Sequence, residues 1–198
     1  MSQFSWKLDL ERCVGCNACT VACKSENNTN PTTSTNSGEA INWRWVVTQK
    51  GGSYGVVKST YYENYISMSC MHCKDPACLL ACPVKPNAIT KDADTGIVNI
   101  DNTKCIGCKR CTWVCPYGAP RFNETTKKVE KCTACSHKLY KKADGTWAYT
   151  TPPACVATCA GKALNYENLT TALTGTNGTP PNNFADPKHT NPQINFVK

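Results

Sequence analysis

Apolar and polar residues alternate most clearly at the start of the chain. Four large apolar side chains recur there at every second position: Phe4, Trp6, Leu8 and Leu10. A period of two is typical of a strand that is buried on one face. We therefore predict a strand over residues 4–10 that leads into the first cysteine-rich segment. A similar strand over residues 97–100 is expected to lead into Cys105.

A second alternating stretch predicts a β-hairpin. Its apolar positions are Ile41, Trp43, Trp45 and Val47. Gly51 and Gly52 then favour a turn, and residues 54–62 are expected to form the returning strand. The polar residues 25–40 predict a surface loop ahead of this hairpin.

The rest of the pattern predicts short helices and a tail. Helices are expected to follow one cysteine in each cysteine-rich segment: Cys19, Cys78, Cys111 and Cys155. Residues 167–198 contain no cysteine and are interrupted by glycines and prolines, which favours an extended tail. The apolar Ile194, Phe196 and Val197 indicate that its end packs against another surface.

Cysteine content changes this picture. Sixteen of the 198 residues are cysteines, and without them the hydrophobic fraction of 40% falls to roughly a third, which is thin for a conventional core. Cross-links or metal are therefore expected to supply stability. The cysteines form four groups of four: Cys13, Cys16, Cys19 and Cys23; Cys70, Cys73, Cys78 and Cys82; Cys105, Cys108, Cys111 and Cys115; Cys132, Cys135, Cys155 and Cys159.

The spacing within the groups favours iron–sulfur clusters. The first and third groups read C-x2-C-x2-C-x3-C, the second reads C-x2-C-x4-C-x3-C, and the fourth is a C-x2-C pair followed by a C-x3-C pair. Three cysteines at two-residue gaps can converge on one cluster while the fourth binds another, as in two-cluster bacterial ferredoxins. Structural zinc needs no third cysteine at this spacing. Cysteines so close on one loop also pair poorly as disulfides.

The net charge fits the same interpretation. The formal value of +8 counts every cysteine as neutral. Thiolates around four oxidised clusters would bring the protein near neutrality. Nucleic-acid binding is disfavoured because no basic stretch is interleaved with aromatic stacking residues.

Other function classes find no support in the sequence. No apolar stretch approaches the roughly 20 residues that cross a bilayer, so no direct membrane span is expected. The start of the chain does not read as an export signal. Motifs for phosphate loops, dinucleotide binding, nucleophile elbows and zinc proteases are missing. We therefore predict no catalytic site in this chain.

The chain contains an internal duplication. Aligning Cys13 with Cys105 superimposes the residues around the first and third groups, and aligning Cys78 with Cys155 superimposes those around the second and fourth. The repeat unit is a two-motif ferredoxin, present twice. Spacing alone leaves the pairing open: groups one and four can pair around a neighbouring pair two and three, or one can pair with two and three with four.

Four further residues have alternative interpretations. His72, inside the second group, is interpreted as supporting a cluster from outside its ligands rather than as a ligand. Trp113 is interpreted as a packing residue, with a place at an electron exit as the alternative. Lys85 and Lys162 occupy matching positions after cysteine groups, and tuning of a cluster potential and simple solvation are equally consistent with both.

The cysteine segments resemble the four-cluster electron-transfer (beta) subunit of the dimethyl sulfoxide reductase family of molybdopterin oxidoreductases. The matching segments are CVGCNACTVACKSEN, CMHCKDPACLLACP, CIGCKRCTWVCPYGAPRFNE and KCTAC with the later PPACVATC. The resemblance covers about residues 4–166, and the nearest types are the dimethyl sulfoxide, polysulfide and arsenate reductase subunits. It implies an α+β fold of two bacterial-ferredoxin-like lobes with an inserted β-hairpin and an extended C-terminal tail. The implied domains are a first lobe of residues 1–24 plus 121–166, a loop and β-hairpin insertion over residues 25–64, a second lobe over residues 65–120 and a tail over residues 167–198.

The resemblance also implies that motif one pairs with motif four and motif two with motif three. Four [4Fe-4S] clusters would then be held as follows: cluster 1 by Cys13, Cys16, Cys19 and Cys159; cluster 2 by Cys23, Cys132, Cys135 and Cys155; cluster 3 by Cys70, Cys73, Cys78 and Cys115; cluster 4 by Cys82, Cys105, Cys108 and Cys111. Some relatives place tryptophan at the position of Cys108 and hold a three-iron cluster, so the cysteine here implies a four-iron cluster.

The implied function is electron transfer between a molybdopterin catalytic subunit and a quinone, cytochrome or other redox partner. Cluster 1 would lie nearest the catalytic subunit and cluster 4 nearest a membrane anchor subunit or cytochrome. The expected location is the outer face of the cytoplasmic membrane or the periplasm, with the cytoplasm as the alternative. A soluble polyferredoxin, or the equivalent subunit of a formate dehydrogenase or hydrogenase complex, is the competing assignment.

Overall fold

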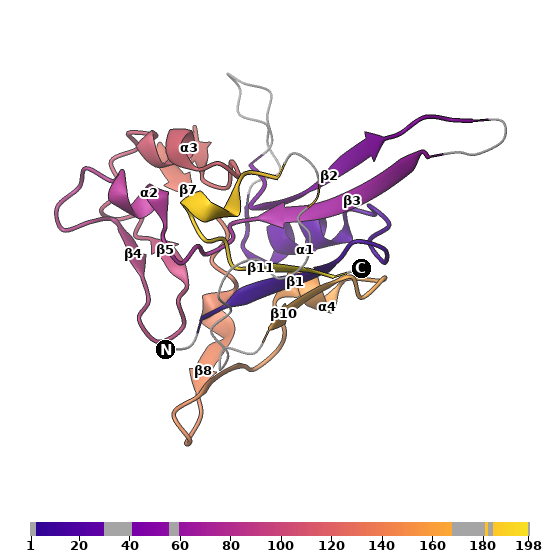
Figure 1. Cartoon of the computed structure of the whole chain (residues 1–198). Helices are drawn as coiled ribbons and strands as arrows, with labels where there is room; N and C mark the ends of the chain where they lie inside the picture. Colours follow the sequence, from indigo (N-terminus) through magenta and orange to yellow (C-terminus); the bar gives the residue numbers. More distant parts are fainter. Residues whose placement is uncertain (1–2, 30–40, 56–59, 168–180, 182–183, 198) are drawn as a thin grey trace.

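The computed structural model describes residues 3–29, 41–55, 60–167, 181 and 184–197. Strands outnumber helices in this part of the chain, and the helices are short (Figure 1). Most of the expected surface loop and much of the expected tail lie outside the described residues.

A three-stranded sheet brings the two ends of the chain together. Its central strand β1 (Ser5–Asp9) pairs antiparallel with β10 (Leu164–Glu167) and parallel with β11 (Ile194–Val197). The strand predicted at the start of the chain is confirmed, and its alternation has the expected cause because Trp6 and Leu8 are buried.

The end of the chain packs as its apolar residues indicated. Ile194 and Phe196 are buried. Just before β11, the Gln193 N–H donates to the Met71 carbonyl oxygen at 3.0 Å, and the Trp6 N–H donates to the Gln193 carbonyl oxygen at 2.9 Å. The C-terminal segment therefore links the start of the chain to the second cysteine group.

The second alternating stretch forms a hairpin of β2 (Arg44–Gly51) and β3 (Tyr62–Ser69), which projects from the body of the protein (Figure 1). The hairpin was predicted, but the return over residues 54–62 is wrong. Gly51 pairs with Tyr62 and Arg44 with Ser69. The connection is thus longer than a tight turn after Gly51, and the returning strand runs directly into the second cysteine group.

Three short antiparallel pairs complete the described sheets. They are β4 (Ile89–Lys91) with β5 (Val98–Ile100), β6 (Arg121–Asn123) with β7 (Lys128–Glu130), and β8 (Leu139–Lys141) with β9 (Trp147–Tyr149). The strand expected over residues 97–100 corresponds to β5.

Each predicted helix forms, and each begins one residue before the cysteine used to predict it. The four helices are α1 (Ala18–Glu26), α2 (Ala77–Leu80), α3 (Arg110–Val114) and α4 (Ala154–Ala157). Two 3-10 turns, η1 (Ser136–Lys138) and η2 (Pro187–His189), lie farther along the chain. Helix α1 packs against α4, and α2 packs against α3. Segments of groups one and four therefore lie together, as do segments of groups two and three.

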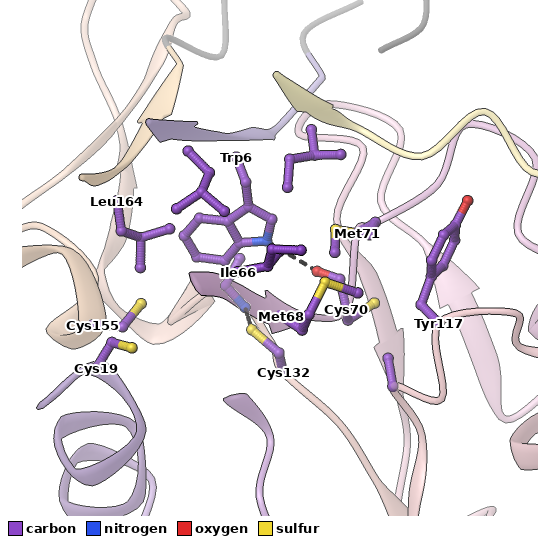
Figure 2. Packing of buried hydrophobic residues seen from close by; sticks show 14 of the residues in the cluster. Trp6, Cys19, Ile66, Met68, Cys70, Met71, Tyr117, Cys132, Cys155 and Leu164 are labelled. Carbon is purple, nitrogen blue, oxygen red and sulfur yellow. Dashed lines mark hydrogen bonds between the residues drawn. The ribbon is translucent and has the colours of Figure 1, made fainter. Parts of the chain in front are cut away.

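The main core lies between β1 and β3 and includes cysteine side chains (Figure 2). Ile66 and Met68 of β3 belong to the same buried cluster as Trp6 of β1. Its buried cysteines include Cys19, Cys70, Cys132 and Cys155. No helix among the described residues is long and apolar enough to cross a membrane.

Candidate metal centres

The first C-x2-C loop of each of the four cysteine groups turns at the residue just before its second cysteine. That residue has a positive φ in every loop: Gly15 at 69°, His72 at 44°, Gly107 at 73° and Ala134 at 53°. In two of the loops its N–H donates to the preceding sulfur, from His72 to Cys70 Sγ at 3.5 Å and from Ala134 to Cys132 Sγ at 3.3 Å. Successive N–H groups in such a turn form a concavity that favours anions.

Close packing requires glycine at two of these positions. A Cβ atom on Gly15 would lie 2.4 Å from the Tyr65 ring, and one on Gly107 would lie 2.3 Å from the Lys127 carbonyl oxygen. Tyr65 belongs to β3, and Lys127 lies in the turn between β6 and β7. The first and third cysteine loops are thus packed directly onto the hairpins beside them.

The first site combines the first group with the last cysteine of the chain. Its four cysteines line a hollow of about 370 Å³: Cys13, Cys16, Cys19 and Cys159. Ser67 Oγ lies 3.3 Å from Cys19 Sγ, and the Leu164 N–H donates to Cys159 Sγ at 3.4 Å. Cys16 is exposed whereas Cys19 is buried, so one edge of this site faces solvent.

Two further hollows combine the second and third groups. One, of about 380 Å³, is lined by Cys70, Cys73, Cys78 and Cys115. The other, of about 320 Å³, is lined by Cys82, Cys105, Cys108 and Cys111. In each hollow, one cysteine comes from the group that supplies the other three to the neighbouring site. Cys108 is exposed, as its counterpart Cys16 is in the first site.

The remaining cysteines meet in the interior. They are Cys23, Cys132, Cys135 and Cys155, and all four are buried. Burial raises the pKa of the Cys23 thiol, and the sulfurs of the other three cysteines raise it further. The structure therefore brings every cysteine into one of four sets, and each set draws on two of the sequence groups.

Burial also makes isolated thiolates costly at Cys132 of this interior set and at cysteines of other sets. It raises the pKa of Cys73 and Cys78 to about 12 and the pKa of Cys111 and Cys132 to about 11, with neighbouring sulfurs adding to the effect. Positive charge among the sulfurs reverses this preference, because a bound cation deprotonates the thiols that coordinate it.

These sets fit a [4Fe-4S] cluster. Four sulfurs surround each lined hollow, apolar side chains form much of the walls, and backbone N–H groups donate to several sulfurs, which are features that hold such clusters and set their potentials. In the described part of the chain, no three histidine, cysteine or acidic side chains are arranged to hold a single metal ion, so a lone ion such as zinc does not account for these sets. All sixteen cysteines are free of disulfides.

Two buried cations beside the cysteines were missed by the sequence analysis. Arg44 is 1% exposed and Lys131 is 3% exposed. The Lys131 ammonium donates to the Val98 carbonyl oxygen and, at 3.0 Å, to the Cys132 carbonyl oxygen, and it lines the hollow around Cys70. Arg44 gave no signal because it occupies a polar position of an alternating strand. The only indication for Lys131 in the sequence was its position next to Cys132.

The residues with alternative interpretations have different outcomes. Burial lowers the pKa of His72 well below its usual range, and its Nδ1 accepts the Val98 N–H at 3.1 Å. This nitrogen is therefore occupied outside the cysteine sets. The packing interpretation of Trp113 is wrong, because its side chain on α3 is 77% exposed. Lys85 and Lys162 are both exposed.

A family model described as a 4Fe-4S dicluster domain matches residues 61–169. This region contains the second, third and fourth cysteine groups. The match independently associates the cysteine spacing with iron–sulfur chemistry.

Three similar proteins are named as components of oxidoreductases. A component of the anaerobic dimethyl sulfoxide reductase of Escherichia coli is 35% identical over 169 residues, covering 83% of this chain and 73% of the relative. A sulfite dehydrogenase subunit of Allochromatium vinosum is 35% identical over 148 residues, covering 70% and 58%. A tetrathionate reductase subunit of Salmonella typhimurium is 35% identical over 161 residues, covering 81% and 56%.

Proposed function

This protein belongs to the iron–sulfur electron-transfer subunits of the dimethyl sulfoxide reductase family of molybdopterin oxidoreductases, and on that premise we propose that it holds four [4Fe-4S] clusters in two ferredoxin-like lobes. The observation that carries this proposal is the division of sixteen cysteines into four sets of four. When bound, each cluster supplies one-electron transfer without proton transfer.

The proposed ligand sets exchange one cysteine between neighbouring clusters. Cys23 belongs to the first sequence group but would bind the second cluster, and Cys159 belongs to the fourth group but would bind the first. The same exchange relates Cys115 to the third cluster and Cys82 to the fourth. The packing of α1 against α4 and of α2 against α3 supports this pairing. Each lobe then holds two adjacent clusters.

The order of the clusters would make the protein a conductor between two partners. Cys16 and Cys108 are exposed, so the first and fourth clusters each have an edge that a partner protein can approach. We place the catalytic subunit next to the first cluster and a membrane anchor subunit or cytochrome next to the fourth. The exposed Trp113 and Leu80 lie on α3 and α2 near the fourth cluster's ligands, and they would be covered by that partner.

The chain's own residues would act by holding and shielding the clusters. Backbone N–H groups donate to Cys70, Cys132 and Cys159 and thereby stabilise negative charge on sulfur. The complex as a whole is proposed to lie on the outer face of the cytoplasmic membrane or in the periplasm. Fractionation of the native host tests this location.

Metal analysis tests the cluster proposal. The protein purified without oxygen should contain about sixteen iron and sixteen sulfide per chain, four of each for every cluster. Stoichiometric zinc with little iron would contradict the proposal. Size-exclusion chromatography of native extract tests the partner, because an electron-transfer subunit should elute with a much larger protein whereas a free polyferredoxin should elute alone.

A further inference from the structure

The guanidinium of Arg44 is buried beside the first and second cysteine sets. Its Nη1 donates to Ser67 Oγ and its Nη2 to Ser69 Oγ, both at 2.9 Å. The Trp6 ring lies over the guanidinium at 4.2 Å. Among the described residues, no carboxylate forms an ion pair with Arg44. A buried charge without a counter-charge is costly. We therefore expect an anion close to the Arg44 guanidinium.

Cysteine sulfurs are the groups that can supply this negative charge. Burial by itself would lower the pKa of Arg44, but four neighbouring cysteines raise it: Cys155, Cys132, Cys19 and Cys23. They come from the first two proposed clusters. Once these sulfurs are thiolates bound to iron, each cluster with its ligands carries net negative charge, and Arg44 becomes the internal counter-charge for both.

Ser67 connects Arg44 to one of these sulfurs. Its Oγ lies 3.3 Å from Cys19 Sγ and accepts the Arg44 Nη1–H. Because arginine has no acceptor, the hydroxyl must accept from Arg44, and its own hydrogen is left to donate elsewhere. A cluster-bound Cys19 thiolate offers an acceptor for that hydrogen.

We propose that Arg44 and Ser67 form a charge-assisted relay that raises the reduction potential of the cluster held by Cys13, Cys16, Cys19 and Cys159. This inference rests on the proposed function. Reduction of the cluster adds one electron and no proton, so the added negative charge stays on the cluster and its sulfurs. A fixed cation and an O–H donor aimed at sulfur stabilise the reduced form more than the oxidised one. Arg44 and Ser67 are therefore positioning residues for electron transfer through the first cluster.

Ser69 is a matched control within the same hairpin strand. It accepts from Arg44 at the same 2.9 Å distance as Ser67. Its own hydroxyl donates to the Cys70 carbonyl oxygen at 3.3 Å, not to a sulfur. Loss of either hydroxyl removes one hydrogen bond from Arg44, but only loss of Ser67 removes a donor to a sulfur of the first cluster.

The test is a redox titration of the whole protein, followed by electron paramagnetic resonance. The variants are Ser67→Ala, Ser69→Ala, Ser67→Thr and Arg44→Gln, and the signal of the first cluster is the one altered in Cys13→Ser. Ser67→Ala should shift the reduction equilibrium of that cluster against the reduced form by about tenfold, equivalent to about 59 mV for one electron. Arg44→Gln should shift it in the same direction by at least as much. Ser67→Thr keeps the hydroxyl and should restore the native potential, whereas Ser69→Ala should leave this potential unchanged.

Three results would overturn the relay: no shift in Ser67→Ala, equal shifts in Ser67→Ala and Ser69→Ala, or selective loss of iron in Ser67→Ala, which would assign the contact to folding. If Arg44→Gln fails to fold, the serine variants still test whether the relay affects the potential of the first cluster. Iron and sulfide analysis of the unaltered protein is made in the same preparation. A low iron count there would contradict the proposed function itself, whereas a full count with an unshifted Ser67→Ala would contradict only the relay.

Discussion

The indole N–H of Trp6 donates to the carbonyl oxygen of Cys70 at 3.0 Å (Figure 2). Trp6 lies on β1, which leads into the first cysteine group, and Cys70 begins the second group. The same ring is packed edge-on against Phe4 with the centroids 4.7 Å apart. The Trp6 side chain therefore connects the strand that leads into the first cysteine group with the start of the second group.

Replacing Trp6 should weaken the whole assembly. Trp6→Leu removes the hydrogen bond to Cys70 and leaves a cavity in the core, and large-to-small core substitutions of this kind cost about 2–4 kcal/mol. The variant should lose the visible absorption of its proposed clusters at a lower denaturant concentration than the unaltered protein. Trp113→Leu is the control, because Trp113 is 77% exposed and exposed substitutions usually change stability by about 0.5 kcal/mol or less. Equal effects of the two substitutions would contradict this account of the core.

The pairing of motifs one and four can be tested with cysteine variants. Cys159→Ser and Cys13→Ser should alter the same paramagnetic signal, because both sulfurs line one hollow despite their separation in sequence. Cys105→Ser should alter a different signal, since Cys105 lines another hollow. If Cys159→Ser instead changed the signal that is lost in Cys105→Ser, the proposed pairing would be wrong.

Cys108 should determine the iron content of the fourth cluster. It is exposed while Cys105 and Cys111 are buried, so Cys108→Ser or Cys108→Trp should leave a folded protein whose three remaining cysteines hold a three-iron cluster. Iron analysis should give a loss of about one iron per chain, and resonance spectra should show the three-iron signal. Cys16→Ser is the matched variant at the first cluster, where the mutated cysteine is also exposed.

The same Cys108 variants also test which end of the protein meets which partner. A three-iron cluster at the fourth position should block electron supply from a quinol or cytochrome, while artificial dyes still supply the catalytic subunit directly. Parallel assays with quinol and dye measure this difference. If dye-driven activity fell as far as quinol-driven activity, the fourth cluster would lie at the catalytic end instead.

Gly107 should tolerate no side chain. Gly107→Ala would add a Cβ atom 2.3 Å from the Lys127 carbonyl oxygen, at a φ of +73°. Backbone cannot move aside as a flexible side chain can, so the loop that carries Cys105 and Cys108 should shift and the iron content should fall. Gly118→Ala is the control, because its φ of +61° imposes similar backbone strain but nothing lies within 4 Å of the added atom. Equal iron loss in both variants would show that strain alone is responsible.

Short-range patterns were sufficient to predict much of this structure. Alternation identified β1 and the packing of Ile194 and Phe196, because one face of each of these strands is buried. Alternation also located β2, although Arg44 is the only buried residue of that strand. Helices α1 to α4 were anticipated for a local reason as well, since each begins beside a cysteine that a loop presents. The start of β3 was misplaced because its register depends on a pairing with β2, which local composition does not encode.

Long-range contacts account for what the sequence did not reveal. Arg44 looks like an ordinary polar residue of a strand, and only the folded hairpin brings its guanidinium to Ser67 and the cysteines. His72 and Ala134 share a positive φ with two loop glycines. Neither residue is a glycine, so the sequence did not indicate this backbone conformation. Trp113 was interpreted as a packing residue, whereas it is exposed on the short helix α3.

The position of β1 between β10 and β11 constrains the order of assembly during synthesis. Its two neighbours on the sheet are residues 164–167 and 194–197, so the chain must be synthesised at least as far as residue 197 before this sheet can close. The cysteine sets within residues 70–115 depend on no such late segment for their sulfurs. A growing chain can therefore fill those two sites first, whereas Cys13, Cys16 and Cys19 stay without their fourth partner until Cys159 has been made.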